Sequence, residues 1–222
     1  MHRINLETWP RRKHFNVFSQ WDYPHFSMCA NMDLTVLMPY LRQQGTSITI
    51  AMVYLVARAA NAVPEFRWRI RPGEVVAHDI VHPAVTILGK DDLFGFCHFR
   101  YEEDFSDFAA DAAGRIAAVK ESPSIENPSG RDDYLYMTSI PWVSFTSFLH
   151  PLHLHPVDSV PRFAWGRFFE EGDLIKMPLN AQGHHAVMDG LHMGRFYNLV
   201  EEYLKRPEEV LASSPVRREF HS

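Results

Sequence analysis

A seven-residue run near the end of the chain, HHAVMDG at 184–190, joins a strand-like stretch to an amphipathic one. After it, apolar side chains follow helical spacing at Phe196, Leu199, Val200, Tyr203 and Leu204. Asp189 then occupies the N-cap position of a helix over 191–204, and His185 lies just before it on a strand end or loop. Histidine has an unperturbed pKa of about 6.5, so it can act as a neutral base at pH 7. The run therefore predicts a catalytic base, His185, beside a rigid anchor, Asp189.

Helical and strand-like patterns are interspersed along the chain without a regular strand–helix–strand repeat. Helices are expected over about 46–63 and 104–120. Strands are expected over 66–70, 75–77, 84–88, 93–99, 134–138, 144–148, 163–169 and 174–182. Stretches rich in proline, glycine or serine indicate loops over 122–133 and 150–161. This arrangement predicts an α+β fold in which helices pack on one mixed sheet.

Length and composition indicate a compact chain with one core. The 222 residues are 46% hydrophobic and include 16 phenylalanines, which predicts a single domain over 1–206, followed by a polar C-terminal tail over 207–222. No apolar run approaches the ~18 residues of a membrane span, and the N-terminus lacks a signal-peptide layout. Two cysteines, Cys29 and Cys97, form no disulfide framework. We therefore expect a cytoplasmic protein that does not associate with membranes.

The charge balance bears on the partners of the chain. The net charge is −5, which argues against nucleic acid as a partner, because phosphate binding needs a basic patch. A local basic spot for a nucleotide phosphate remains compatible with this value.

Four further motifs accompany the C-terminal run. They are WPRRKHF at 9–15, NAVPEFR at 61–67, PWVSFTSF at 141–148, and GD at 172–173 with MPL at 177–179. Taken in order and over nearly the whole chain, these motifs and the HxxxDG run resemble the trimeric chloramphenicol O-acetyltransferases, which are coenzyme A-dependent acyltransferases. A single HxxxD match is weak, whereas five ordered motifs are specific.

The resemblance implies a fold, an activity and an assembly. It implies a two-layer α/β sandwich and acetyl-CoA as co-substrate, with chloramphenicol as the leading acceptor alcohol. Another hydroxylated xenobiotic or metabolite is the alternative acceptor. It also implies a homotrimer with active sites between subunits, so that His185 of one chain faces Thr138 of its neighbour.

Four residues receive catalytic or scaffold roles through the resemblance. His185 deprotonates the acceptor hydroxyl directly, without an acyl-enzyme. Asp189 pairs with Arg11 and fixes the segment that carries His185; the alternative is an N-cap without an ion pair. Thr138 stands where the family has a serine that stabilises the oxyanion, and its hydroxyl can donate the same bond. Ser139 is the alternative donor, although strand alternation favours Thr138.

Eight residues receive binding roles in the same way. The coenzyme A path is expected along Pro141, Trp142, Arg167 and Phe168, and the acceptor pocket along Phe18, Phe148, His150 and Leu152. Two positions depart from the family pattern, because His150 replaces a leucine and Ala164 replaces a threonine. An imidazole in an apolar pocket costs free energy unless it is hydrogen-bonded, so His150 favours a more polar acceptor.

Two other classes of function are weighed against this interpretation. Six residues in two clusters are potential metal ligands: His150, His153, His155, His184, His185 and Asp189. They lack helical His-x-x-x-His or Cys-His spacing, so no metal site is predicted. A non-catalytic protein that sequesters ligands is the second alternative, and the retained base, anchor and hydroxyl argue against it.

Overall fold

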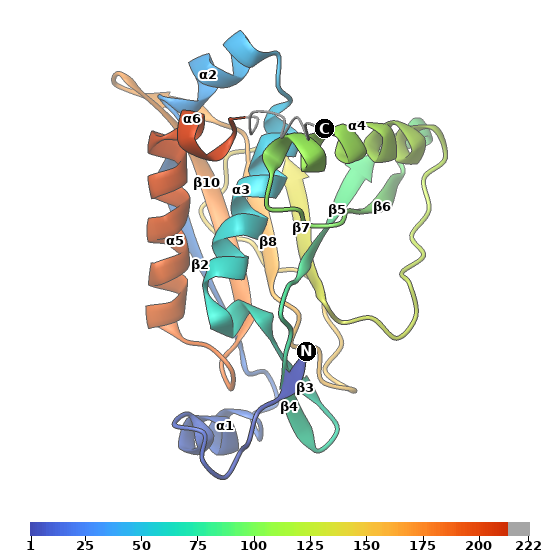
Figure 1. Cartoon of the computed structure of the whole chain (residues 1–222), viewed down its shortest axis with the longest axis vertical. Helices are drawn as coiled ribbons and strands as arrows, with labels where there is room; N and C mark the ends of the chain where they lie inside the picture. Colours follow the sequence, from blue (N-terminus) through green and yellow to red (C-terminus); the bar gives the residue numbers. More distant parts are fainter. Residues whose placement is uncertain (213–222) are drawn as a thin grey trace, which may run out of the picture.

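A computed structural model describes residues 1–212 (Figure 1). Its larger sheet has seven strands in the order β2-β10-β8-β7-β5-β6, with β9 also paired to β10. Their bounds are β2 His25–Asp33, β5 His82–Leu88, β6 Phe94–His98, β7 Tyr134–Ile140, β8 Arg162–Gly166, β9 Phe169–Glu171 and β10 Leu174–His184. The β5–β7 and β7–β8 pairs are parallel and the others are antiparallel, which confirms the predicted mixed sheet.

Three helices pack on one face of this sheet, as Figure 1 shows: α3 (Ile48–Ala62), α4 (Phe105–Glu121) and α5 (Gly190–Lys205). The core forms between them and the alternate strand residues that point to this face, such as Met137, Phe163 and Leu179. Ten of the 15 residues of α3 are buried, because this apolar helix contacts both α4 and α5 as well as the sheet. The expected helix and strand layers are confirmed.

The opposite face of the sheet is polar. Strand register places two rows of side chains on it, namely Thr86, Thr138, Ala164 and Asn180, and beside them Ala84, Tyr136, Arg162 and Gln182. The irregular segment 141–161 covers part of this face, since the backbone N–H of His150 donates to Gln182 Oε1 and the Ser27 hydroxyl donates to the Phe148 carbonyl. The polar face is therefore partly covered by this segment.

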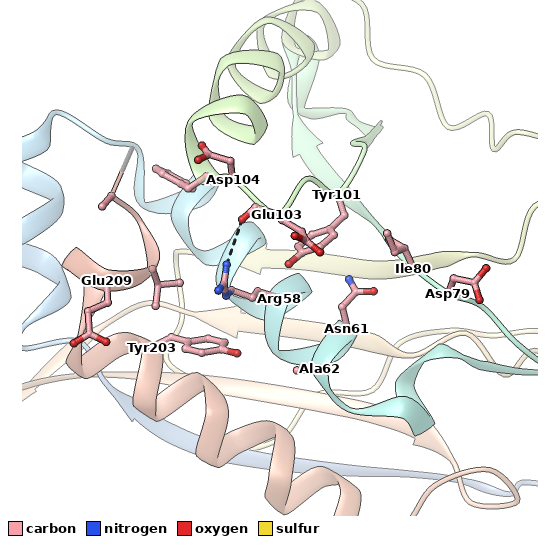
Figure 2. Close-up of a pocket in the computed structure, with 13 residues that line it drawn as sticks. Arg58, Asn61, Ala62, Asp79, Ile80, Tyr101, Glu103, Asp104, Tyr203 and Glu209 are labelled. Carbon is pink, nitrogen blue, oxygen red and sulfur yellow. Dashed lines mark hydrogen bonds between the residues drawn. The ribbon is translucent and has the colours of Figure 1, made fainter. Parts of the chain in front are cut away.

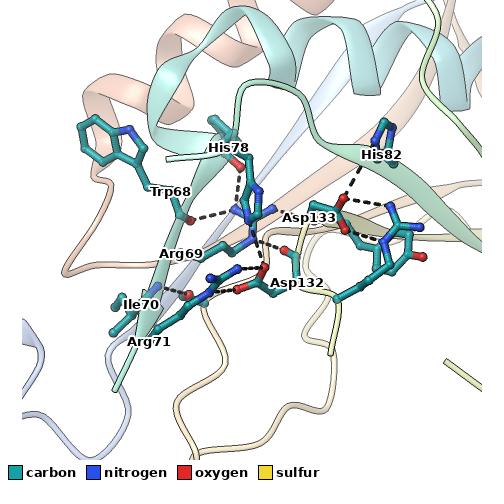
Figure 3. Close-up of polar contacts among 12 residues, drawn as sticks. Trp68, Arg69, Ile70, Arg71, His78, His82, Asp132 and Asp133 are labelled. Carbon is teal, nitrogen blue, oxygen red and sulfur yellow. Dashed lines mark hydrogen bonds and ion pairs between the residues drawn. The ribbon is translucent and has the colours of Figure 1, made fainter. Parts of the chain in front are cut away.

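A second, three-stranded sheet has the order β1-β4-β3 and lies beside the start of β7. Its strands are β1 (His2–Arg3), β3 (Trp68–Arg71) and β4 (Glu74–Ala77). The buried Arg69 guanidinium donates to the carbonyls of Asp132 and Tyr134, and burial lowers its pKa to about 10 (Figure 3). Arg71 and His78 bind the carboxylate of Asp132, which lies just before β7, so polar contacts link the small sheet to the start of β7.

Several elements differ from the sequence-based expectation. The strand expected over 144–148 is absent: Phe145 and Phe148 contact each other with ring centroids 5.4 Å apart, whereas residues three apart on a strand point to opposite faces. The strand expected over 163–169 is two strands, β8 and β9. No expectation covered β2 or three short helices: α1 (Arg12–Phe18), α2 (Leu37–Gln44) and α6 (Pro207–Val210).

The predicted domain boundary at residue 206 is too early. Pro207 and Leu211 are buried, and Leu211 belongs to the main core, because α6 folds back beside α5. Residues 213–222 of the predicted tail lie outside the described part of the chain. Among residues 1–212, no helix has both the length and the apolar character to span a bilayer.

Candidate active site

His185 lies in the tight turn between β10 and α5, as predicted. Its Nδ1 lies 3.1 Å from the Met188 carbonyl oxygen, which only accepts, so Nδ1 carries the proton and Nε2 of the neutral ring is free to act as a base. The ring stacks on Phe18 at a centroid distance of 4.0 Å and an angle of 8°, and also contacts Phe26. Phe18, a predicted acceptor-pocket residue, is thus in direct contact with the predicted base.

Arg11 holds this turn at three points. Its Nη1 pairs with Asp189 Oδ2 at 2.6 Å, its Nη2 donates to the His185 carbonyl at 2.9 Å, and its Nε donates to the Ala186 carbonyl at 3.2 Å. Burial alone raises the pKa of Asp189, but its bond to Arg11 and the nearby charges of His192 and Arg11 outweigh burial and lower it. The predicted Arg11–Asp189 pair is confirmed, and the alternative of an unpaired N-cap is wrong.

Asp189 is also the N-cap of α5, as predicted, and His192 completes a capping box. Asp189 Oδ1 accepts from the Leu191 N–H at 3.0 Å, while His192 Nδ1 accepts from the Asp189 N–H at 3.0 Å. His192 Nε2 lies 3.2 Å from Glu65, which comes from the short helix after α3. Neither residue was expected at the site. The position of His192, three residues after the cap, is the signal that could have pointed to it.

Packing supports the turn from both sides. Val187 is buried against Trp9 and Val75, so the small sheet and the N-terminal motif support the turn directly. Gly183, just before the two histidines, lies so close to Met188 that a Cβ added there would be 2.2 Å from its sulfur. The segment that carries His185 therefore has little room to move.

Thr138 lies on the polar face of the sheet and lines a cavity of about 350 Å³. Its Oγ1 is 3.2 Å from Thr86 Oγ1, which donates to it and leaves the Thr138 proton available. Ser139 registers with Trp165, whose side chain belongs to the core on the other face. The expectation that Thr138 and Ser139 point to opposite faces of the strand is confirmed, and the oxyanion role of Thr138 stays a prediction.

Two predicted acceptor residues share this cavity with Thr138, and a third lies beside it. His150 and Leu152 line it, and the Phe148 ring packs against the His150 ring with centroids 4.8 Å apart. Burial, and secondly the charge of Arg162, lower the pKa of His150 to about 4, so its ring is neutral at pH 7. Arg162, also in the wall, was missed, because only the strand register brings it there.

The four predicted coenzyme A residues are all exposed and come from two adjacent segments. Trp142 is 59% exposed and Phe168 is 47% exposed, so both rings are open to a ligand. The Arg167 N–H donates to the Val143 carbonyl at 2.9 Å, so the turn with Pro141 and Trp142 lies beside the segment with Arg167 and Phe168.

The chain alone does not bring His185 to Thr138. Thr138 registers with Ala164, and Ala164 with Asn180 of β10. From strand spacings of about 4.8 Å and a rise of about 3.3 Å per residue, Thr138 and His184 are about 16 Å apart at Cα. In addition, His185 contacts Phe26, which points to the helical face, whereas Thr138 points to the polar face. Within one chain the two residues face different surroundings.

Two of the histidines considered as metal ligands have other partners. His184 Nδ1 accepts from the Ala186 N–H, and His185 Nδ1 donates to the Met188 carbonyl. No group of three or more histidine, cysteine or carboxylate side chains in the described part of the chain is arranged to hold a metal. His184 is structural, as predicted, and burial, together with His25, lowers its pKa to about 3.

A larger depression of about 740 Å³ lies on the helical side of the molecule (Figure 2). Arg58 lies at its centre, over the rings of Tyr54 and Tyr203, and donates to the Glu103 carbonyl. None of the predicted catalytic or binding residues lines it. Its size therefore does not mark it as the reaction site.

Comparisons with known proteins agree with this geometry. The chloramphenicol acetyltransferase family model matches residues 1–201. Chloramphenicol acetyltransferase 2 of Escherichia coli is 34% identical over 90% of this chain and 94% of its own length, and the Klebsiella sp. enzyme is 30% identical over 90% and 92%.

Solved structures show the same fold. A chloramphenicol acetyltransferase superposes with a TM-score of 0.83 at 27% identity, over 92% of this chain and 99% of its own. The dihydrolipoamide acetyltransferase of Azotobacter vinelandii shares the fold at 15% identity, with a TM-score of 0.65 over 90% and 88%. The architecture is thus that of the coenzyme A-dependent acyltransferases, and the chain belongs to the chloramphenicol acetyltransferase family.

Proposed function

We propose that this protein transfers the acetyl group of acetyl-CoA to a hydroxyl of chloramphenicol. The observation that carries the proposal is His185, whose Nδ1–H bond to Met188 leaves Nε2 as the base, in a turn that Arg11 fixes at three points. Family membership and curated relatives that bear the name of this activity support the acceptor.

The reaction uses His185 first as a base and then as an acid. Nε2 takes the proton of the acceptor hydroxyl as its oxygen attacks the thioester carbonyl. The tetrahedral oxyanion collapses, the carbon–sulfur bond breaks, and the imidazolium returns the proton to the coenzyme A thiolate. No acyl-enzyme forms. The Nδ1 bond to the Met188 carbonyl holds the ring in the required tautomer throughout.

Thr138 supplies the hydrogen bond to the oxyanion. Because its Oγ1 accepts from Thr86, its own proton is free for that bond, and Thr86 acts as a positioning residue. One donor of this kind accounts for about 10²–10³ in kcat. The family has a serine at this position. This chain has Thr138 there, which keeps the required hydroxyl.

The active site forms between two subunits of a homotrimer. Support comes from the separation of about 16 Å between Thr138 and His184 within one chain, and from the contact of His185 with Phe26, which points to the face opposite Thr138. A general base must lie within about 3 Å of the proton it removes. A neighbouring copy that presents its Thr138 cavity to the His185 turn satisfies this requirement.

Coenzyme A binds along the two exposed segments. The rings of Trp142 and Phe168 offer stacking surfaces for the adenine or pantetheine, and Arg167 offers a cation for the phosphates. Stacking of a base on an aromatic ring contributes ~1–3 kcal/mol in nucleic-acid complexes. Pro141 keeps the turn that presents Trp142 rigid.

A thiol-release assay with acetyl-CoA and chloramphenicol tests the proposal. We expect turnover by the wild type, and His185→Ala should lower kcat by ~10²–10⁴ with little change in KM for acetyl-CoA. His155→Ala, an exposed histidine outside the site, is the matched control and should retain activity. Turnover that disappears with a chelator would indicate a metal enzyme instead. Chloramphenicol binding without thiol release would indicate a sequestering protein.

One observation favours a second acceptor, another hydroxylated xenobiotic or metabolite. The cavity beside Thr138 contains charged and polar side chains, including Asp158 and Arg162. The same assay over a panel of alcohols, with chloramphenicol included, ranks the acceptors by kcat/KM.

A further inference from the structure

One peptide unit lies between the predicted base and a second, buried imidazole. This unit joins Met188 to Asp189. Its carbonyl oxygen accepts from His185 Nδ1 at 3.1 Å, and its N–H donates to His192 Nδ1 at 3.0 Å. The C=O and N–H of a trans peptide unit point in opposite directions, so the two histidine rings lie on opposite sides of it. Both hydrogen bonds polarise the same peptide group, and each therefore strengthens the other.

His192 connects this peptide unit to a carboxylate. Its Nδ1 accepts from a backbone N–H, so the neutral ring carries its proton on Nε2, which lies 3.2 Å from Glu65 Oε1. Burial lowers the pKa of His192, although the charges of Glu65 and Asp189 oppose this effect, and the ring is therefore neutral at pH 7. The contacts thus run from Glu65 through His192 and one peptide unit to His185.

Glu65 occupies a costly position for a carboxylate. The residue is 9% exposed, and its Oε2 is buried without a hydrogen-bond partner among residues 1–212. Asp189 is neutralised by Arg11, whereas the imidazole beside Glu65 carries no charge. An uncompensated buried carboxylate lowers stability. The cap of α5 needs only the Nδ1 atom of His192, so stability does not account for the charge of Glu65.

We propose that Glu65 and His192 are positioning residues for His185. Through the Met188–Asp189 peptide unit they hold the ring with Nδ1 protonated, and the charge of Glu65 stabilises the imidazolium that forms when Nε2 takes a proton. The proposal rests on the proposed function, because it concerns the base of that reaction. It adds one carboxylate from the short helix after α3 to the Arg11–Asp189 pair, whose own charges cancel.

The expected size of the effect follows from the length of this path. Three polar contacts in series place the Glu65 carboxylate about 12 Å from the His185 ring. At an effective dielectric constant of about 20–40, loss of one charge at that distance shifts the protonation equilibrium about three- to tenfold, or about 0.5–1 pH unit. The other charged or titratable groups around the turn stay unchanged: Arg11 before α1, His184 at the end of β10, and Asp189 and Arg195 at the start of α5.

Alkylation of His185 by iodoacetamide tests the proposal on the full chain without turnover. Only the neutral ring reacts, so the rate rises with pH, and mass spectrometry of the peptide locates the label. Glu65→Gln keeps the shape and an oxygen that can accept from His192, and the midpoint of its rate profile should fall by about 0.5–1 pH unit. Glu65→Asp keeps the charge and should stay within about 0.3 pH unit of the wild type. Glu202→Gln, which removes an exposed charge from α5, is the matched control and should leave the midpoint unchanged.

Kinetics and stability separate this role from a merely structural one. Glu65→Gln should lower kcat about three- to tenfold and leave KM for acetyl-CoA unchanged. Its Tm should stay the same or rise, because an uncompensated buried charge is removed. A structural role would instead lower Tm and leave the alkylation midpoint in place.

Three results would overturn the proposal. They are an unchanged or raised midpoint in Glu65→Gln, a midpoint in Glu65→Asp as low as that in Glu65→Gln, and a fall in kcat without a shift of the midpoint. Failure of the proposed function is seen separately, as absent thiol release by the wild type with every acceptor, because alkylation does not require turnover.

Discussion

The Arg11–Asp189 pair joins the two ends of the chain, and its removal should affect both stability and rate. The variants are Arg11→Ala and Asp189→Asn, of which Asn keeps the shape and the N-cap and removes only the charge. Arg11 makes three hydrogen bonds and its side chain is 11% exposed, while that of Asp189 is 31% exposed. Breaking a fully buried pair costs about 3–5 kcal/mol, so we expect about 2–3 kcal/mol at this partly exposed one.

Thermal unfolding at one fixed protein concentration gives the first readout. For a chain of this size the expected loss corresponds to a Tm lower by about 5–10 °C. The turn with His185 then loses its position, so kcat should fall by about ten- to a hundredfold. The double variant should cost less than the sum of the single ones, with a coupling of about 1–2 kcal/mol. Additivity within about 0.3 kcal/mol would refute the reasoning. Arg12→Ala, an exposed neighbour, is the control.

Variants at Thr138 and at His184 test the other half of the site and one buried histidine. Thr138→Ser should retain activity because it keeps the hydroxyl, whereas Thr138→Val should lower kcat by about 10²-fold. If Thr138→Val left kcat unchanged and Ser139→Ala abolished activity, the assignment of the two strand faces would be reversed. The pKa of His184 is about 3 in the folded chain and about 6.5 when unfolded, so the unfolded chain binds the extra proton between these values. The stability from neutral His184 is complete above pH 6.5 and is lost as the pH falls toward 3. Between pH 6 and 4.5 the free energy of unfolding of His184→Asn should therefore fall less steeply with pH than that of the wild type, by up to ~1.4 kcal/mol per pH unit. Chemical denaturation at several pH values measures this slope, and equal slopes for the two proteins would contradict the prediction.

Local signals in the sequence were sufficient to predict the turn and the helix that follow β10. The cap residue Asp189, the helical spacing after it and the position of His185 all lie within a few residues of one another. The match between local pattern and structure is close here because the turn, the cap and α5 are determined mainly by their own residues. Arg11 lies 178 residues from Asp189 in the sequence, and it was predicted from the family resemblance rather than from local spacing.

Other parts of the site depend on tertiary contacts that no local pattern reports. Glu65 reaches His192 from another helix, and Thr86 reaches Thr138 only because β5 and β7 are parallel neighbours. Arg162 enters the cavity through strand register. The strand expected over 144–148 was wrong because its two phenylalanines pack on each other, which a strand does not allow.

Complementation between two inactive variants tests most directly the claim that one site needs two subunits. His185→Ala and Thr138→Val chains are each nearly inactive alone, and they are co-expressed in equal amounts so that mixed oligomers form. In a cyclic assembly each interface joins the His185 of one chain to the Thr138 of the next, so about a quarter of the interfaces carry both native residues. We predict that the mixture regains about a quarter of the wild-type thiol-release activity. Activity no higher than the average of the two parent variants would contradict a site shared between subunits.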